Sequence, residues 1–361
     1  MSLWVVVGGQ YGGEGKGKIS AYITQHENID VCIRCGGPNS GHSFVAEDGT
    51  TKLLRQVPTG YIRPQTRLLI PAGALVDLGV LKDELDSFGL DGARVGIDRN
   101  TMVIEESDRE REAGLKLRER LSSTLCGVGS AVSRRVLRGA DVKLAKEAAQ
   151  EHPWLKELLT DVSLESNEAL DAGKKVLVEG TQGFGLSLYH SQHYPCATSR
   201  DTSSAGFLSE VGLSPRLVTE IVLVLRTFPI RVAGQQAGPL HDEIDWEILQ
   251  KESGYPYPIE EKTTVTKKVR RLGRFDWKLA NAAVRVNRPT QLAINGLDYL
   301  DFRDLDCKDY GSLSRKPKAF VDELEQRYQT PVTYCGVGPG LGQICRPPIG
   351  AHAGLSELVH R

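Results

Sequence analysis

The residues best suited to chemistry lie in a glycine-rich segment near the start of the chain. Residues 9–18 contain five glycines and two lysines, and an apolar run at 3–7 precedes them. Glycines let backbone N–H groups curl around a phosphate, and the helix that follows adds the positive end of its dipole. The segment therefore predicts a phosphate-binding loop. An ordinary glycine turn with solvent-facing lysines is the alternative.

The spacing Gly12-x-x-x-x-Gly17-Lys18 fits the bare pattern of a phosphate loop. In the standard loop a Ser or Thr follows the lysine and holds magnesium, whereas Ile19 stands there in this chain. The glycines also fit no G-x-G-x-x-G dinucleotide register. The chemistry indicated is phosphate binding by a variant loop.

Short apolar runs that lead into glycine-bearing turns recur along the chain. We expect strands at 3–7, 31–34, 68–70, 175–178, 221–225 and 291–294, and helices at 16–26, 78–88, 143–160 and 277–287. This alternation predicts an α/β fold with a large, mostly parallel central sheet flanked by helices. Ligands of such sheets lie beyond the carboxyl ends of the strands, where the glycine turns fall. No repeat or linker interrupts the pattern, so residues 1–361 are expected to form a single domain.

Composition narrows the class of partner. The chain has 45 basic and 46 acidic side chains, so it lacks the strong overall field that favours nucleic acid or a membrane surface. Without a signal peptide or a run of about 18 apolar residues, we expect a cytoplasmic protein. Cys32 and Cys35 fall three apart on an expected strand and should face opposite sides of the sheet, which argues against a shared metal.

Six segments resemble, in the same order, motifs of the adenylosuccinate synthetases. G-Q-Y-G-G-E-G-K-G-K at 9–18 resembles the family's G-x-Q-W-G-D-E-G-K-G-K loop. The others are G-G-P-N-S-G-H-S at 36–43, V-E-G-T-Q-G at 178–183, H-Y-P-C-A-T-S at 193–199, R-R-L-G at 270–273 and N-G-L-D at 295–298. On these residues the chain is identified as a member of that family.

The resemblance implies a ligase reaction in two steps. A nucleoside triphosphate phosphorylates O6 of a purine nucleotide, and the amine of L-aspartate then displaces the phosphate from C6. The catalytic residues implied are His42, Gln182 and Lys16. A histidine can stabilise charge on the transferring phosphoryl group and donate a proton to it. A structural role for His42, as the cap of a turn, is the alternative.

The resemblance also assigns the binding residues. The triphosphate is expected at Gly12, Glu14, Gly15, Lys16, Gly17, Lys18, Gly41, His42 and Ser43, and Mg²⁺ at Gly13 and Gly41. The substrate nucleotide is expected at Gly13, Asn39, Thr124, Arg138, Gln182 and Thr198. L-Aspartate is expected at Thr264, Val265, Thr266, Lys268 and Arg270, within a candidate mobile loop at 251–274. Lys268 stands where the family has an arginine. The family counterpart of Arg138 reaches in from a second subunit, so a homodimer is implied.

The most informative departure from the family is Gly13. The family has an aspartate there, which takes the proton from N1 of inosine and ligates magnesium. Glycine can do neither, but its empty side-chain position would admit the 2-amino group of guanine. We therefore expect the phage-type reaction of the family, from dGMP to N6-succino-2-amino-2′-deoxyadenylate for DNA that contains 2-aminoadenine, in the host cytoplasm. The alternatives are an ordinary IMP-using enzyme with another base, such as Glu14, and a nucleotide-binding protein without catalysis.

A second departure concerns the phosphate donor. Asp298 matches the family aspartate that pairs with guanine of GTP, but the flanking lysine is replaced by Gly296 and the later S-T-G segment by Gly336 and Gly338. These changes remove partners of guanine O6 and favour ATP or dATP over GTP. Asp298 as a simple strand-end cap is the alternative. The sequence names neither the base that replaces the family aspartate nor the group that selects deoxyribose.

Overall fold

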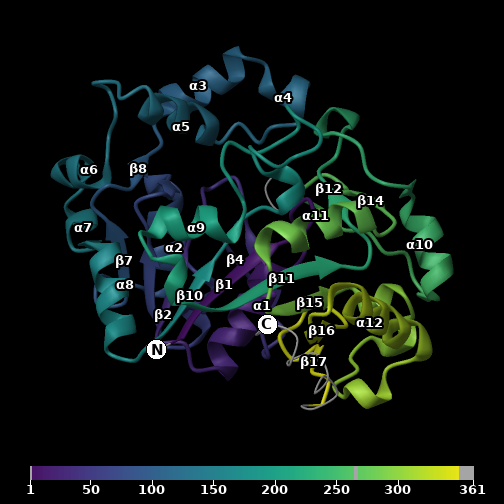
Figure 1. Ribbon diagram of the computed structural model, residues 1–361. Helices are drawn as coiled ribbons and strands as arrows, with labels where there is room; N and C mark the ends of the chain where they lie inside the picture. The colour runs from purple at the N-terminus through teal and green to yellow at the C-terminus, as the bar shows by residue number, and fades with distance from the viewer. Residues whose placement is uncertain (1, 264–266, 349–361) are drawn as a thin grey trace.

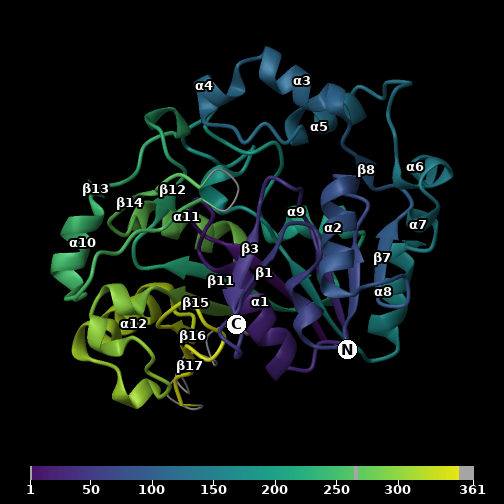
Figure 2. The same cartoon turned by 180° about the vertical axis from the view of Figure 1, so that it is seen from behind.

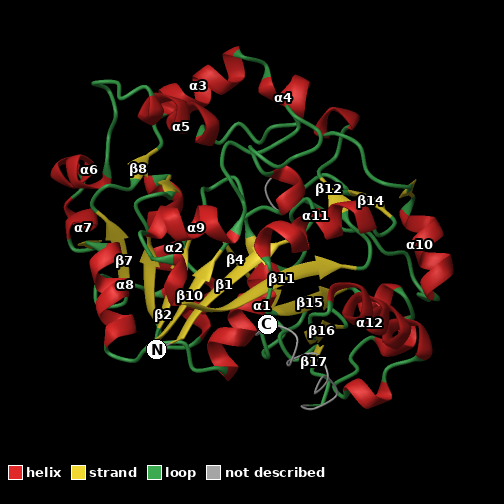
Figure 3. Cartoon of the chain, viewed as in Figure 1, coloured by secondary structure: helices red, strands yellow, loops and turns green. Residues whose placement is uncertain are grey.

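The computed structural model describes residues 2–263 and 267–348. Its centre is a ten-stranded sheet in the order β17-β16-β15-β11-β1-β10-β2-β5-β7-β9 (Figures 1 and 3). All neighbouring strands run parallel except the β16–β17 pair. The bounds are β1 Ser2–Gly8, β2 Val31–Arg34, β5 Arg67–Ile70, β7 Val95–Asp98, β9 Leu159–Thr160, β10 Lys175–Glu179, β11 Val218–Arg226, β15 Gln291–Asn295, β16 Val332–Gly336 and β17 Ile344–Cys345. The expected fold, a mostly parallel sheet flanked by helices, is confirmed.

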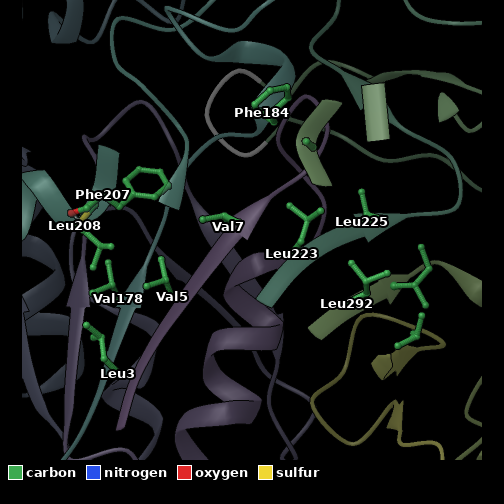
Figure 4. Close-up of a cluster of buried hydrophobic side chains, with 14 of the residues drawn as sticks. Leu3, Val5, Val7, Val178, Phe184, Phe207, Leu208, Leu223, Leu225 and Leu292 are labelled. Carbon is green, nitrogen blue, oxygen red and sulfur yellow. Dashed lines mark hydrogen bonds between the residues drawn. The ribbon is translucent and has the colours of Figure 1, made fainter. Parts of the chain in front are cut away.

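The strands are apolar on both faces because both faces are covered. Alternate side chains of β1, such as Leu3, Val5 and Val7, belong with Phe207 of α9 (Ser204–Val211) to the core on one face (Figure 4). The other helices of this face are α8 (Val162–Asp171), α11 (Trp277–Asn287) and α12 (Arg315–Tyr328). Continuous apolar strands of this kind are typical of buried parallel sheets.

The opposite face packs against α1 (Lys16–His26), α2 (Leu78–Phe88) and α6 (Ala145–Glu151). Figure 2 shows α1 and α2 on this side of the sheet. Cys32 belongs to the cluster on this face and Cys35 to the cluster on the other, so the prediction that they point apart is confirmed.

Local sequence sets the helix ends. Asp77 accepts the Val80 N–H at the start of α2, and Gly89 ends the helix in the left-handed conformation that glycine adopts without steric cost. The helices expected at 16–26, 78–88 and 277–287 are confirmed at both ends. The single helix expected at 143–160 is wrong. Pro153 lacks an N–H, so the chain breaks there into α6, α7 (Pro153–Lys156) and β9.

Smaller elements rise beyond the carboxyl ends of the central strands. One is an antiparallel pair formed by β3 (His42–Val45) and β4 (Thr51–Leu54). A second is a three-stranded sheet in the order β12 (Ile230–Arg231), β14 (Arg271–Gly273), β13 (Glu243–Ile244). The third is a parallel pair formed by β6 (Leu75–Val76) and β8 (Met102–Val103). Helices α3 (Glu106–Gly114), α4 (Leu117–Leu121) and α5 (Val128–Val136) lie above them in Figure 1. The segment 251–274 was expected to be a loop, but its first residues belong to α10 (Trp246–Ser253) and its last residues include β14. Within the part of the chain described, no helix is long and apolar enough to cross a membrane. The single-domain interpretation stays a prediction.

Candidate active site

A cavity of about 620 Å³ opens at the carboxyl edge of the sheet. Its walls come from the glycine loop after β1, the turn before β3, the segment after α4, β12, and the chain between α10 and β14. The predicted site residues that line it are Gly12, Gly13, Gly15, Lys16, Gly17, Asn39, Gly41, His42, Ser43, Thr124, Gln182, Lys268 and Arg270. The structure thus brings together, in one space, residues spread over about 260 positions of sequence.

The glycine loop depends on backbone angles that other residues rarely adopt. Gly12, Gly13 and Gly15 have φ of 82°, 69° and 90°. Gln182 shares the left-handed region at 58°, a strained conformation of the kind found at functional sites. Its side-chain oxygen would lie 3.7 Å from a Cβ at Gly12. The loop and Gln182 therefore pack closely across the cavity floor.

Glu14 is turned into the loop rather than into the cavity. Its carboxylate accepts the backbone N–H groups of Gln10 and Gly12 and pairs with Lys16 Nζ at 2.6 Å. Glu14 does not line the cavity, whereas Lys16 does. Glu14 thus stabilises the loop from within, and Lys16 is the charge that the loop presents to a ligand.

The Nδ1 atom of His42 contacts charged side chains, whereas the Nε2 atom has no partner among the described residues. Nδ1 contacts the Glu179 carboxylate and the Arg34 guanidinium, and Arg34 pairs with Glu179 at 2.6 Å. Thr59 donates both its N–H and its hydroxyl to Glu179 at 2.8 Å. Nε2 is buried and has no partner among the described residues. Because the ionised carboxylate can only accept, its contact favours the Nδ1–H tautomer, in which Arg34 does not donate to Nδ1 but to Glu179, and Nε2 is left for a ligand.

Burial and the Arg34 charge lower the pKa of His42 to about 4. Burial opposes ionisation of Glu179, but His42, Arg34 and Thr59 outweigh it and hold its pKa at about 2. At neutral pH the cluster is therefore a neutral imidazole between a carboxylate and a guanidinium.

This cluster predicts a loss of stability in mild acid. The folded pKa of His42 lies below its ordinary value of 6.5, so the unfolded chain binds the proton first. The stability that neutral His42 contributes is complete above about pH 6.5 and is lost as the pH falls towards 4. Between these limits, the free energy of unfolding in urea should fall by up to about 3 kcal/mol more for the unmodified protein than for His42→Gln. An equal fall in both would contradict the assignment.

Residues near Gly13 leave little room in this conformation. A Cβ there would lie 2.8 Å from Ile230 Cδ1 and 3.3 Å from Arg270 Nη1. The Gly13 carbonyl accepts a bond of 3.0 Å from Arg226 Nη1. Position 13 is therefore bounded by one apolar side chain and two guanidinium groups.

Several predicted residues lie outside this cavity. Arg138 is exposed, and Thr198 does not line the cavity, although its N–H donates to the carbonyl of the lining residue Leu186. Three donor-base candidates, Asp298, Gly336 and Gly338, lie near Lys18, whose Nζ donates to the Gly338 carbonyl at 2.8 Å, whereas Gly296 lies against Thr227 and Tyr299. Burial lowers the pKa of Lys18 to about 8. Thr264, Val265 and Thr266 lie outside the described residues.

Several residues of the site were not predicted from the sequence. Arg34 and Glu179 each end a buried apolar strand with a charge, and that pattern was readable in the sequence. Arg118, Ser122 and Ser123 line the cavity without a comparable signal. Two more cavity residues, Ile230 and Glu261, come from segments whose position depends on tertiary packing.

The oxygens available for a metal are few. The Gly41 segment and the Ser43 side chain line the cavity, but the described chain forms no cluster of three His, Cys, Asp or Glu that could hold an ion. Mg²⁺ binds proteins mainly through one or two protein oxygens together with substrate phosphates and water. The residues therefore fit a magnesium ion that arrives on a triphosphate.

Comparison with known proteins shows the family of the chain. The family model described as adenylosuccinate synthetase matches residues 5–152 and 140–306. The adenylosuccinate synthetase of Thermococcus onnurineus is 40% identical over 95% of this chain and 98% of its own. The chain therefore belongs to the adenylosuccinate synthetase family. It is an enzyme of the carbon–nitrogen ligase class.

Two solved structures share the fold. Succinoaminodeoxyadenylate synthetase of cyanophage S-2L, in a complex with dGMP and dATP, superposes with a TM-score of 0.80 at 27% identity, covering 100% of this chain and 99% of the phage protein. Adenylosuccinate synthetase of Plasmodium falciparum superposes with a TM-score of 0.83 at 20% identity, covering 96% and 100%. The second likeness concerns the fold alone.

Proposed function

We propose that the chain joins L-aspartate to C6 of dGMP, through a 6-phosphoryl intermediate, to give N6-succino-2-amino-2′-deoxyadenylate. The observation that carries the proposal is Gly13 on the cavity wall. A purine with an amino group at C2 needs space beside N1. A longer side chain at position 13 would have to displace Ile230, 2.8 Å from the position of its Cβ, or project into the cavity and occupy that space. The phage protein with the same fold is bound to dGMP and dATP, which supports the proposal.

Ordinary adenylosuccinate synthesis from IMP is the second candidate. The relative from Thermococcus onnurineus, named adenylosuccinate synthetase, is more similar in sequence than the phage protein, at 40% against 27% identity. Both candidates need a base in place of the family aspartate, because hypoxanthine and guanine each carry a proton on N1. Glu14 does not suit that role, because its carboxylate is bonded inside the loop. A nucleotide-binding protein without catalysis is the third candidate.

The residues of the cavity suit both steps. Lys16 and the N–H groups of the loop bind the triphosphate. His42 Nε2 meets the transferring phosphoryl group, whose negative charge favours the protonated ring. Gln182 orients the purine, while Lys268 and Arg270 bind the two carboxylates of aspartate. Thr124 and Asn39 hold the nucleotide.

We propose ATP or dATP as the phosphate donor. Asn295, beside the donor-base candidates, donates from Nδ2 to the Glu14 carbonyl, while its buried Oδ1 has no partner among the described residues. An acceptor oxygen at this place can accept a hydrogen bond from the exocyclic amine of adenine, whereas it would repel O6 of guanine, which is itself an acceptor. Mg²⁺, held by the Gly41 carbonyl and the phosphates, would neutralise charge on the triphosphate.

We also propose a homodimer with shared sites. Arg138 follows two exposed apolar side chains, Val136 at 72% and Leu137 at 71% exposure. A partner subunit that covers them would carry Arg138 towards its own cavity. We propose a cytoplasmic location for the enzyme.

Shared sites predict complementation. Arg138→Ala and His42→Ala should each be inactive, yet a mixture that exchanges subunits should regain part of the activity, because one hybrid site keeps both residues. Activity is measured as phosphate release after co-refolding. A mixture no more active than its components would contradict the shared site.

Separate assays test the substrate. The protein, aspartate, magnesium and ATP are combined with dGMP, GMP or IMP, and phosphate release is followed together with the mass of the product. The proposal expects turnover with dGMP and a succino-2-amino product. Turnover with IMP alone would reject it in favour of the second candidate, and tight binding without turnover would favour the third.

A further inference from the structure

An ion pair between Arg226 and Glu261 lies where the binding segments meet. Arg226 ends β11 and is buried, while Glu261 lines the cavity. The guanidinium binds the carboxylate with two parallel bonds, Nη2 to Oε1 at 2.5 Å and Nη1 to Oε2 at 3.2 Å. Such a bidentate pair fixes orientation as well as distance.

Arg226 also holds the phosphate loop. Its Nη1 donates to the Gly13 carbonyl at 3.0 Å. The Gln10 side chain makes two hydrogen bonds with the backbone of Arg226. It donates to the Arg226 carbonyl at 3.0 Å and accepts from the Arg226 N–H at 3.1 Å. Movement of the loop at Gly13 therefore disturbs the guanidinium.

Glu261 begins a hairpin stem that carries candidate aspartate ligands. The Arg270 N–H donates to the Glu261 carbonyl at 2.8 Å, and the Thr263 N–H donates to the Lys268 carbonyl at 2.8 Å. Lys262 and Val269 form an antiparallel bridge between these bonds. Lys268 and Arg270 are thus fixed to the stem that Glu261 anchors.

A third segment reaches the same carboxylate. The Tyr299 hydroxyl donates to Glu261 Oε1 at 3.0 Å, and Tyr299 directly follows the donor-base candidate Asp298. The loop beside the purine, the aspartate hairpin and the donor-base segment therefore converge on one ion pair.

Glu261 is the one carboxylate among the described residues that line the cavity. It is a poor substitute for the family's base, because both oxygens are already engaged by Arg226 and Tyr299. Burial opposes its ionisation, but Arg226 outweighs burial and lowers the pKa of Glu261. The geometry favours a role in positioning.

We propose that the Arg226–Glu261 pair couples the binding of aspartate to the binding of the purine nucleotide, by tying the hairpin stem to Gly13. The inference rests on the proposed assignment of these segments to aspartate and purine. Because coupling is reciprocal, aspartate should tighten nucleotide binding by the factor with which nucleotide tightens aspartate binding.

Calorimetry on the intact protein tests the coupling. The Kd of dGMP and of IMP is measured with and without saturating aspartate, and the tighter nucleotide is used. We expect aspartate to lower the Kd about tenfold in the unmodified protein. In Arg226→Lys the ratio should fall below about twofold, because an ammonium cannot replace the guanidinium fork. Glu261→Gln, which keeps the shape and loses the charge, should do the same.

A matched control removes another ion pair. Arg67 binds Glu165 at 2.7 Å through Nε, away from the cavity, so Glu165→Gln should retain the tenfold ratio. Unchanged coupling in both site variants would overturn the proposal, even if their thermal midpoints fall. Loss of kcat at every pH in Glu261→Gln with coupling intact would instead identify Glu261 as the base, and would also overturn it. Preference for IMP in the unmodified protein contradicts the dGMP assignment alone.

Discussion

Replacement of Gly13 by aspartate is expected to lower kcat/KM for dGMP by at least about 100-fold and to raise it for IMP. Asp tolerates the left-handed backbone at φ 69° better than most residues, so the loop should keep its shape. Its Cβ displaces the Ile230 δ-methyl group, which stands 2.8 Å away, and its carboxylate occupies the space beside the purine. With IMP the same carboxylate can take the N1 proton. Steady-state kinetics with both nucleotides checks this.

Gly13→Asn is the matched control. Asparagine has nearly the shape of aspartate and adopts the left-handed conformation as readily, but it carries no charge. If space decides the specificity, Gly13→Asn should lose dGMP turnover as aspartate does, yet should not gain IMP turnover. Undiminished use of dGMP by Gly13→Asn would show that the steric explanation is wrong. Thermal unfolding of both variants confirms that they fold.

Removal of the imidazole has the second largest expected effect. His42→Ala should lower kcat by about 1000-fold with little change in the Kd of the nucleotides, because Nε2 acts on charge that develops in transfer of the phosphoryl group. Single-turnover measurement of the 6-phosphoryl intermediate separates this step from the attack of aspartate. Calorimetric Kd values report binding.

Glu179→Gln provides the comparison for His42. The amide oxygen still accepts from Nδ1–H, so the ring keeps its tautomer, but the charge that stabilises an imidazolium is lost. We expect a smaller loss of kcat than in His42→Ala. If His42→Ala keeps near-normal kcat, the ring is structural, as the cap of a turn would be.

Local patterns predicted most of the elements around the site. The strands at 3–7 and 31–34 and the helix at 16–26 carry their signals in adjacent residues, namely apolar runs and glycine turns. β7 and β16 were missed because short apolar runs do not differ from buried helix segments by periodicity. At 143–160, helical spacing of apolar residues concealed the break at Pro153.

The residues of the site likewise fall into two groups, those that local sequence predicts and those that depend on contacts between distant segments. The glycine loop and His42 were predicted from motifs and do line the cavity. Arg34 and Glu179 were missed: the charge that ends each apolar strand is a local signal, but their contact with each other follows from β10 pairing with β2. The contact of Arg226 with Gly13 likewise joins positions 213 apart. Contacts between distant segments could not be predicted from the sequence, because they depend on the order in which the strands pair in the sheet.

Competition between substrates tests the central claim most directly. Equal concentrations of dGMP and IMP are given to the enzyme with aspartate, magnesium and dATP in one reaction, and the two succino products are quantified by mass spectrometry at low conversion. Their ratio equals the ratio of the two kcat/KM values. We predict a large excess of the 2-amino-2′-deoxy product. An excess of adenylosuccinate would contradict it and assign the chain to IMP.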